Sequence, residues 1–406
     1  MKLSDYTIVG RQPAAIFAPQ MPEEAQEIVR QSVGKALVSW GGGTRQSLGY
    51  PPERYDAVLL TTYLNKVTEY EPADLTITAQ AGVTAATLQA VLGQHGQCLP
   101  LDIARPDFQT LGGMVATRAN SLRRFSSGSV RDLLLGVSVV NSRGELIKGG
   151  GKVVKNVAGY DLPKLYCGSF GTLGLITEVT FKVSPLPETS VTIALPLDAD
   201  RNSEDVLDHL LGSDLLPSFL FLLSPRAASA VLRGADDTQY ILVGFDGDAE
   251  TVAWQVKTLG AGVLDDALAA EAGAALRDFS LQDAPLTAEF HVLSSQVGAF
   301  SRMLEWTARR SGLTAEVASD AALGLMTAHF APLSDTVDWL GFYADLKDKA
   351  DRCGGSFILA QMPETLRSAD VPVWSPLLPD FGLMAKLKET LDPARMWNPG
   401  RFVGKL

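Results

Sequence analysis

Residues 155–187, KNVAGYDLPKLYCGSFGTLGLITEVTFKVSPLP, decide the fold of this chain. They hold four glycines between Gly159 and Gly174 and then run into an apolar, β-branched strand that ends at Pro185. Glycines spaced in this way let backbone amides approach a flat or anionic group closely, because no Cβ stands in between. The stretch therefore predicts one wall of a binding site, followed directly by a buried strand.

The bulk properties predict a folded protein of two or three domains. The chain has 406 residues, 46% of them hydrophobic and 20% charged, which is enough apolar surface for a large core. Its net charge of -11 argues against a nucleic-acid partner, because such binding depends on clustered Lys and Arg.

The three cysteines, Cys98, Cys167 and Cys353, are far apart and form no C-x-x-C pair. This spacing predicts neither a disulfide framework nor an iron–sulfur site, and it favours a reduced, cytoplasmic setting. The first ten residues contain no sustained apolar run, and the longest apolar block, around residues 219–223, is too short to cross a bilayer. We therefore expect no membrane span.

A second glycine cluster follows a predicted helix and strand near the N-terminus. Pro22 and two glutamates open the helix, residues 36–40 form a buried strand, and Gly41-Gly42-Gly43-Thr44 follows it. A Rossmann site would need a helix directly after these glycines, and the Pro51-Pro52 pair leaves no room for one. Any phosphate bound here is expected to lie on a nest of loop amides.

The remaining pattern predicts an α+β protein. Short strands and helices fill the first region up to the strand at residues 175–183, and from Thr189 longer strands alternate with helices. That alternation predicts a second domain with a sheet covered by helices. A final helix over residues 383–391 precedes Asp392-Pro393 and the turn Trp397-Asn398-Pro399-Gly400-Arg401.

Taken in order, these segments resemble the FAD-binding oxidoreductases of the vanillyl-alcohol oxidase type. The resemblance rests on residues 40–44 with Gly49, residues 100–102 and 110–117, residues 159–177, and the C-terminal Asp-Pro and Asn-Pro-Gly. It implies the two-subdomain, PCMH-type FAD-binding fold over residues 1–188 and an α/β cap domain over residues 189–375. It also implies that residues 376–406 return to the flavin site.

The resemblance assigns cofactor-binding residues segment by segment. The phosphate loop, the flavin-side loop with its packing helix, the second glycine wall and the C-terminal turn are each expected to contact FAD. The residues carried over are Gly41, Gly42, Gly43, Thr44, Arg45, Pro100, Leu101, Gly112, Gly113, Ala116, Thr117, Gly168, Gly171, Thr172, Gly174, Ile176 and Asn398.

Within that family, the chain is similar to the smaller FAD-binding subunit of bacterial glycolate oxidase. Residues 41–45, the run Lys155-Asn156-Val157-Ala158 with its continuation to residue 161, and residues 397–401 carry this likeness. It implies a second flavin subunit and an iron–sulfur subunit as partners, and a short 2-hydroxy acid as substrate. It also implies a cytoplasmic protein that reaches the inner membrane only through its partners.

The sequence departs from the family at its histidines. No histidine lies in or near the first glycine loop, so FAD is expected to bind without a covalent link. The H-x-G-D-G-N-x-H block of related hydroxy-acid dehydrogenases is missing, and lone histidines cannot build a metal site. The catalytic residue is not identified by the sequence; Arg401, as a clamp for a carboxylate, and His329, as a base, are the candidates.

Three functions stay open at this stage. The first is an FAD subunit of a glycolate-oxidase-like complex. The second is a stand-alone flavin oxidase or dehydrogenase of another alcohol, with its base in the cap. The third is a scaffold that keeps the fold without catalysing a reaction.

Overall fold

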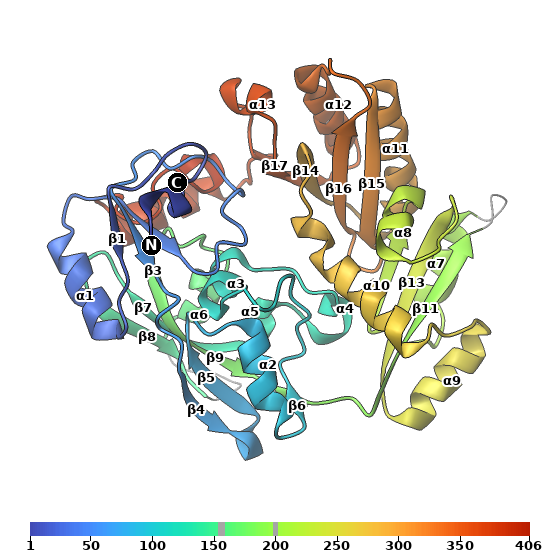
Figure 1. The fold of residues 1–406 in the computed structure, drawn as a ribbon, viewed down its shortest axis with the longest axis horizontal. Helices are drawn as coiled ribbons and strands as arrows, with labels where there is room; N and C mark the ends of the chain where they lie inside the picture. The colour runs from blue at the N-terminus through green and yellow to red at the C-terminus, as the bar shows by residue number, and fades with distance from the viewer. Residues whose placement is uncertain (153–158, 198–201) are drawn as a thin grey trace. The chain divides into compact units, whose positions relative to one another are not determined.

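The computed structural model describes residues 1–152, 159–197 and 202–406 (Figure 1). These form two compact units. Unit 1 contains Met1–Ser121, Gly128–Leu186 and Leu377–Leu406, and unit 2 contains Leu122–Ser127 and Pro187–Pro376. The short segment Leu122–Ser127 packs with unit 2, although the residues on both sides of it belong to unit 1. The sequence did not predict this exchange. The functional domains 1–188, 189–375 and 376–406 stay a prediction.

Unit 1 begins with a small parallel sheet of order β1-β3-β2. Its strands are β1 (Ala15–Phe17), β2 (Leu37–Trp40) and β3 (Ala57–Leu60), and helix α1 (Pro22–Gln31) connects β1 to β2. Pro22 occupies the first turn of α1, and Ala25 and Val29 are its buried residues. They pack in one cluster with Leu37 and Trp397, so the C-terminal segment belongs to the core of this sheet.

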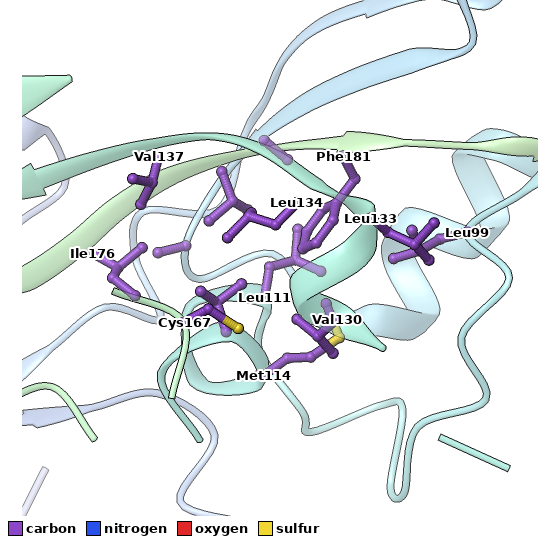
Figure 2. Close-up of a cluster of buried hydrophobic side chains, with 14 of the residues drawn as sticks. Leu99, Leu111, Met114, Val130, Leu133, Leu134, Val137, Cys167, Ile176 and Phe181 are labelled. Carbon is purple, nitrogen blue, oxygen red and sulfur yellow. The ribbon is translucent and has the colours of Figure 1, made fainter. Parts of the chain in front are cut away.

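The second sheet of unit 1 has five antiparallel strands in the order β4-β5-β9-β7-β8. Its central strand β9 (Leu175–Lys182) is the one predicted to follow the glycine-rich stretch. The core beside it brings together β7, β9 and helix α3 (Leu111–Thr117), and Figure 2 shows Leu111, Met114, Val137 and Ile176 among its side chains. The other strands are β4 (Val67–Glu71), β5 (Thr76–Gln80), β7 (Leu134–Val140) and β8 (Leu146–Gly150).

The other elements of unit 1 are short, apart from helices α2 and α14. They are η1 (Leu3–Tyr6), η2 (Pro72–Asp74), α2 (Ala85–Gly93), β6 (Gln97–Cys98), α5 (Val130–Leu133), α6 (Leu162–Tyr166), β10 (Ser184–Pro185), α14 (Phe381–Leu391) and η5 (Val403–Lys405). Strands β6 and β10 form a two-stranded antiparallel pair.

Unit 2 is built on an eight-stranded antiparallel sheet of order β11-β13-β12-β15-β16-β14-β17-β18. Every residue of β12 is buried, and its Phe219, Phe221 and Leu223 pack with α8 and α10. The strands are β11 (Thr189–Leu197), β12 (Phe219–Leu223), β13 (Gln239–Gly247), β14 (Leu286–His291), β15 (Leu313–Asp320), β16 (Leu325–Pro332), β17 (Ser356–Gln361) and β18 (Trp374–Ser375).

Helices accompany these strands along the chain of unit 2. They are α4 (Arg124–Ser127), α7 (Ser203–Leu211), α8 (Pro225–Val231), α9 (Ala249–Leu259), α10 (Asp266–Asp278), η3 (Phe279–Leu281), η4 (Ser294–Gln296), α11 (Val297–Arg310), α12 (Trp339–Arg352) and α13 (Glu364–Ser368). The predicted sheet covered by helices is therefore confirmed.

The C-terminal strap, defined here as residues 392–401, extends the parallel sheet of unit 1. The Leu37 amide donates to the Met396 carbonyl at 2.7 Å, and the Asn398 amide donates to the Leu37 carbonyl at 2.9 Å. This parallel pairing beside β2 places the strap next to the glycine loop that follows Trp40.

Candidate functional site

A pocket in unit 1 collects four segments that are far apart in the sequence. It holds about 730 Å³ of space, solvent included. Its walls are the loop after β2, helix α3 with the residue before its cap, the loop that leads into β9, and the C-terminal strap. The lining residues are Ser39, Trp40, Gly41, Gly42, Gly43, Thr44, Arg45, Gln46, Thr61, Gln109, Gly112, Gly113, Ala116, Thr117, Phe170, Gly171, Gly174, Leu175, Ile176, Asn398 and Arg401.

The loop after β2 must be glycine where it meets the loop before α3. A Cβ on Gly42 would lie 1.7 Å from the Phe108 carbonyl oxygen, and one on Gly41 would lie 2.2 Å from Thr110 Oγ1. This close approach lets Thr44 Oγ1 donate to Gln109 Oε1 at 2.6 Å. Two loops from different parts of the chain thereby form one continuous wall.

The same loop offers backbone donors to an anion. In the part of the chain that the structure describes, the amides of Gly42, Gly43 and Thr44 donate no hydrogen bond to protein acceptors. Gly43 has a φ of +73°, a left-handed conformation that glycine adopts without strain. Successive amides of this kind form the nest that holds phosphate oxygens.

Helix α3 lies against β5 because it carries a glycine at the contact. A Cβ on Gly112 would lie 2.7 Å from the Ala81 Cβ. Thr110 caps the helix, and its Oγ1 accepts from the Gly113 amide at 3.3 Å. The close packing leaves Gly113, Ala116 and Thr117 along the pocket, where these small residues leave room for a flat group.

The loop before β9 is fixed to the end of α3 and to the strap. The Gly168 and Phe170 amides donate to the Val115 and Ala116 carbonyls at 2.9 and 2.8 Å. Gly171 has a φ of +66°, and a Cβ there would lie 2.6 Å from both Asn398 Nδ2 and Ser39 Oγ. Gly171 is thus the point where the second glycine wall, β2 and the strap meet.

Asn398 holds these three segments together with its side chain. Its Nδ2 donates to the Phe170 carbonyl at 2.5 Å and to Ser39 Oγ at 3.3 Å, and its Oδ1 accepts from the Ser39 amide at 3.0 Å. The residue is 5% exposed and has a φ of +44°, a conformation that asparagine tolerates better than most residues.

Arg401 is buried at the pocket wall. Its Nη2 donates to the Gln46 and Leu48 carbonyls at 3.0 and 2.8 Å, so the guanidinium supports the end of the phosphate loop. Burial raises the pKa of the neighbouring Tyr55, while the positive charge of Arg401 acts against that shift. Arg401 therefore brings a positive charge to a pocket that also presents backbone donors.

Five predicted site residues do not line the pocket. Pro100, Leu101, Gly168 and Thr172 are absent from its walls, although Gly168 and Thr172 belong to the loop that forms one of them. His329 lies in unit 2 on β16, where Nδ1 contacts Thr287 Oγ1 at 2.9 Å and Nε2 contacts the Phe279 carbonyl at 2.8 Å. Burial lowers the pKa of His329, so its ring favours the neutral form, with both nitrogens engaged.

Seven lining residues were not predicted. Ser39 and Trp40 directly precede the first glycines, Gln46 follows them, and Gln109 precedes the cap of α3, so adjacency to predicted segments could have found these four. Thr61, which follows β3, carried no sequence signal. The remaining two, Phe170 and Leu175, lie between predicted glycines.

Other predictions concern metals, membranes and residues 155–158. Among the residues that the structure describes, no group of three or more His, Cys, Asp or Glu side chains could hold a metal ion. Within the same residues, no helix combines the length and apolar character needed to cross a membrane. Lys155, Asn156, Val157 and Ala158 lie outside the described residues.

These features fit an extended dinucleotide, because one wall presents backbone donors and the others carry small residues. Residues 13–150 match the family described as FAD binding domain, so the cofactor is FAD. No histidine lines the pocket. The fold and this match together confirm the predicted FAD-binding fold of the vanillyl-alcohol oxidase type.

The comparisons with known proteins agree with this class. The chain is 32% identical over 258 residues to glycolate oxidase subunit GlcD of Bacillus subtilis (strain 168), covering 59% of this chain and 53% of that protein. It is 43% identical over 146 residues to glycolate oxidase subunit GlcE of Escherichia coli (strain K12), covering 36% of this chain and 42% of that protein. The chain thus spans about half the length of these curated relatives.

A solved structure shares the whole fold. An alkyldihydroxyacetonephosphate synthase superposes with a TM-score of 0.71 over 97% of this chain and 78% of that one, at 19% sequence identity. The arrangement of elements is therefore that of a known fold, and the chemistry must be argued from the site.

Proposed function

We propose that this protein is an FAD-dependent oxidoreductase that converts a short 2-hydroxy acid to the 2-oxo acid, as the FAD-binding subunit of a glycolate-oxidase-like complex. The observation that carries the proposal is the pocket of unit 1, in which two glycine walls, α3 and the strap converge. Similarity to glycolate oxidase subunits GlcD and GlcE supports the choice of substrate class.

Each wall of the pocket has a role in this proposal. The amides of residues 42–44 hold the pyrophosphate, and Thr44 with Gln109 fixes the loop that carries them. The wall around Gly171 and the small face of α3 bind the flavin and the adenosine half, with Asn398 at the ring. Arg401 adds positive charge that stabilises an anionic group in the pocket. When bound, FAD supplies the acceptor for hydride from the carbinol carbon.

The division of labour between domains is also part of the proposal. Residues 1–188 and 376–406 hold FAD without a covalent link, and residues 189–375 act as the cap that contacts the substrate. Electrons leave through a second flavin subunit and an iron–sulfur subunit, in a cytoplasmic complex that reaches the inner membrane only through these partners. The proposal assigns no metal to this chain and no base among its residues.

The experiment is anaerobic addition of glycolate to the purified chain, alone and co-expressed with the partner subunits, while the flavin absorbance is followed. We expect FAD to be released on denaturation and the flavin to bleach with glycolate only when the partners are present. Full turnover of glycolate by the chain alone would remove the need for partners.

Two further outcomes would identify the alternative functions. Oxygen consumption by the isolated chain with another alcohol from a panel would identify a stand-alone oxidase. Bound flavin that neither bleaches with any substrate nor exchanges electrons with the partners would identify a scaffold.

A further inference from the structure

A lysine is buried beside the pocket, although it does not line it. Lys388 lies in α14 and is 4% exposed. Its Nζ donates to the Thr172 carbonyl at 2.7 Å, to Asp392 Oδ2 at 2.6 Å and to the Trp397 carbonyl at 2.9 Å. An ammonium group has three donors, so all of them are used within the protein.

Its partner Asp392 is also fully buried and is the first residue of the strap. Its Oδ1 accepts from the Met396 amide at 3.0 Å, and its Oδ2 accepts from the Trp397 amide at 2.8 Å. The carboxylate thus shapes the turn between α14 and the part of the strap that pairs with β2. The Lys388–Asp392 pair joins α14, the strap and the loop before β9.

Two of the three contacts of Lys388 are made to residues that adjoin Asn398 and Gly171 in the sequence. The Trp397 carbonyl belongs to the peptide bond directly before Asn398, and Thr172 directly follows Gly171. Asn398 makes a second link between the same segments, through the Phe170 carbonyl. A left-handed asparagine costs conformational energy and stays in place only where its surroundings fix it.

A buried ion pair is a poor source of stability, because the cost of removing both charges from water can exceed their attraction. The pair does define geometry, since the ammonium must meet three oxygen atoms at fixed positions. The contacts of Lys388 therefore fix the position of Asn398 relative to the loop around Gly171.

We propose that Lys388 is a positioning residue for the FAD pocket, acting through the peptide bond before Asn398 and through the Thr172 carbonyl. The inference rests on FAD binding at this pocket, which is part of the proposed function. It makes the strap a component of the cofactor site whose geometry depends on one buried cation.

The test uses the full chain and compares Lys388→Met with Lys386→Met. Lys386 is exposed in the same helix, so it is a matched control for the loss of a lysine from α14. The apoprotein of each variant is titrated with FAD, and the visible spectrum of the bound flavin is recorded. We expect Lys388→Met to weaken FAD binding by about tenfold or more, and to shift the flavin spectrum, with Lys386→Met unchanged.

A double-mutant cycle with Asn398→Ala separates positioning from general destabilisation. If Lys388 acts through Asn398, the loss of FAD affinity caused by Asn398→Ala is about tenfold smaller when Lys388 is already replaced, because the effects of coupled residues are not additive. If Lys388→Met does not fold, Lys388→Met with Asp392→Asn removes both buried charges, still breaks the links to Thr172 and Trp397, and serves in its place.

The outcomes are separable. Additive losses in the cycle, or an unchanged flavin spectrum and affinity in Lys388→Met, would overturn the positioning role while leaving the proposed function intact. Failure of the wild-type chain to bind FAD would overturn both. Coupled losses with a shifted spectrum would support the positioning role whatever the substrate.

Discussion

At the scale of single residues, Gly171 combines a left-handed backbone conformation with close contacts to two side chains. Gly171→Ala places an L residue at φ +66° and a Cβ 2.6 Å from two side chains. We expect it to lower the free energy of unfolding of unit 1 by about 2–4 kcal/mol, from backbone strain and overpacking together, and to weaken FAD binding. Denaturant unfolding and FAD titration measure the two effects.

Gly168→Ala is the control for Gly171→Ala. Gly168 also has a positive φ, of +81°, but a Cβ there would only make an ordinary 3.5 Å contact with Arg118. Gly168→Ala should therefore lower the free energy of unfolding only through backbone strain, by about 1 kcal/mol. Equal losses from the two substitutions would show that the contact with Asn398 and Ser39 does not matter.

Cys167 gives a second prediction at this scale. Burial raises the pKa of its thiol to about 11, so at pH 8 only about one molecule in a thousand carries the reactive thiolate. Alkylation of the native chain should therefore modify Cys98 and Cys353, which are partly exposed, and spare Cys167 until the chain unfolds. Peptide mass spectrometry measures the alkylation of each cysteine, and labelling of Cys167 in the native chain would contradict the prediction.

Single residues also show what the sequence could reveal about the site. The glycines of both walls and Asn398 were predicted from the family resemblance, and at Gly42 and Gly171 the structure shows that a Cβ would clash. Thr61 and the contact of Gln109 with Thr44 could not be predicted, since they depend on how two loops meet in space. Lys388 was missed because a lysine in an amphipathic helix reads as a solvated residue.

At the scale of elements, β16 carries a pH-sensitive histidine. The folded state favours neutral His329, because burial lowers its pKa, whereas the unfolded chain binds a proton near pH 6.5. The contribution of neutral His329 to the free energy of unfolding is therefore complete above that pH. It falls as the pH drops from 6.5 toward the lower pKa of the folded state. The loss for one proton is at most about 1.4 kcal/mol per pH unit.

The comparison of His329→Gln with wild type between pH 7.5 and 5 tests this. The variant should lose part of the wild-type pH dependence of the free energy of unfolding. His291→Gln, on the exposed side of β14 in the same sheet, keeps His329 and should keep the wild-type slope. Identical slopes for wild type and His329→Gln would refute the prediction.

Elements also show where the sequence pattern succeeded and where it did not. Strands β2 and β9 and helix α14 begin and end within two residues of the predicted ranges 36–40, 175–183 and 383–391, because their apolar runs and flanking residues are local signals. Strands β3 and β15 were missed. β3 is a short apolar run with no flanking turn chemistry, and β15 contains alanine, serine and acidic residues that favour other structures.

At the scale of the whole molecule, unit 1 is discontinuous, and its last part carries Asn398 and Arg401. Removal of residues 377–406 should therefore abolish FAD binding and leave unit 2, with its own sheet and core, folded. Near-ultraviolet circular dichroism of the truncated chain measures whether unit 2 stays folded.

In the full chain, FAD at a hundredfold excess over its Kd should stabilise unit 1 by about 2.7 kcal/mol. A truncated chain that still gains stability from FAD would contradict this.

The discontinuity also orders events during synthesis. Asn398 and Phe170, which share a hydrogen bond, are 228 residues apart in the chain. A ribosome adding about 5–20 residues per second needs roughly 10–45 s to cover that distance. Throughout this interval the half-built pocket lacks its last wall, while Pro187–Pro376 of unit 2 is synthesised. A cell making this protein therefore has to keep an unfinished cofactor site soluble, and the flavin joins a chain in which unit 2 is already present.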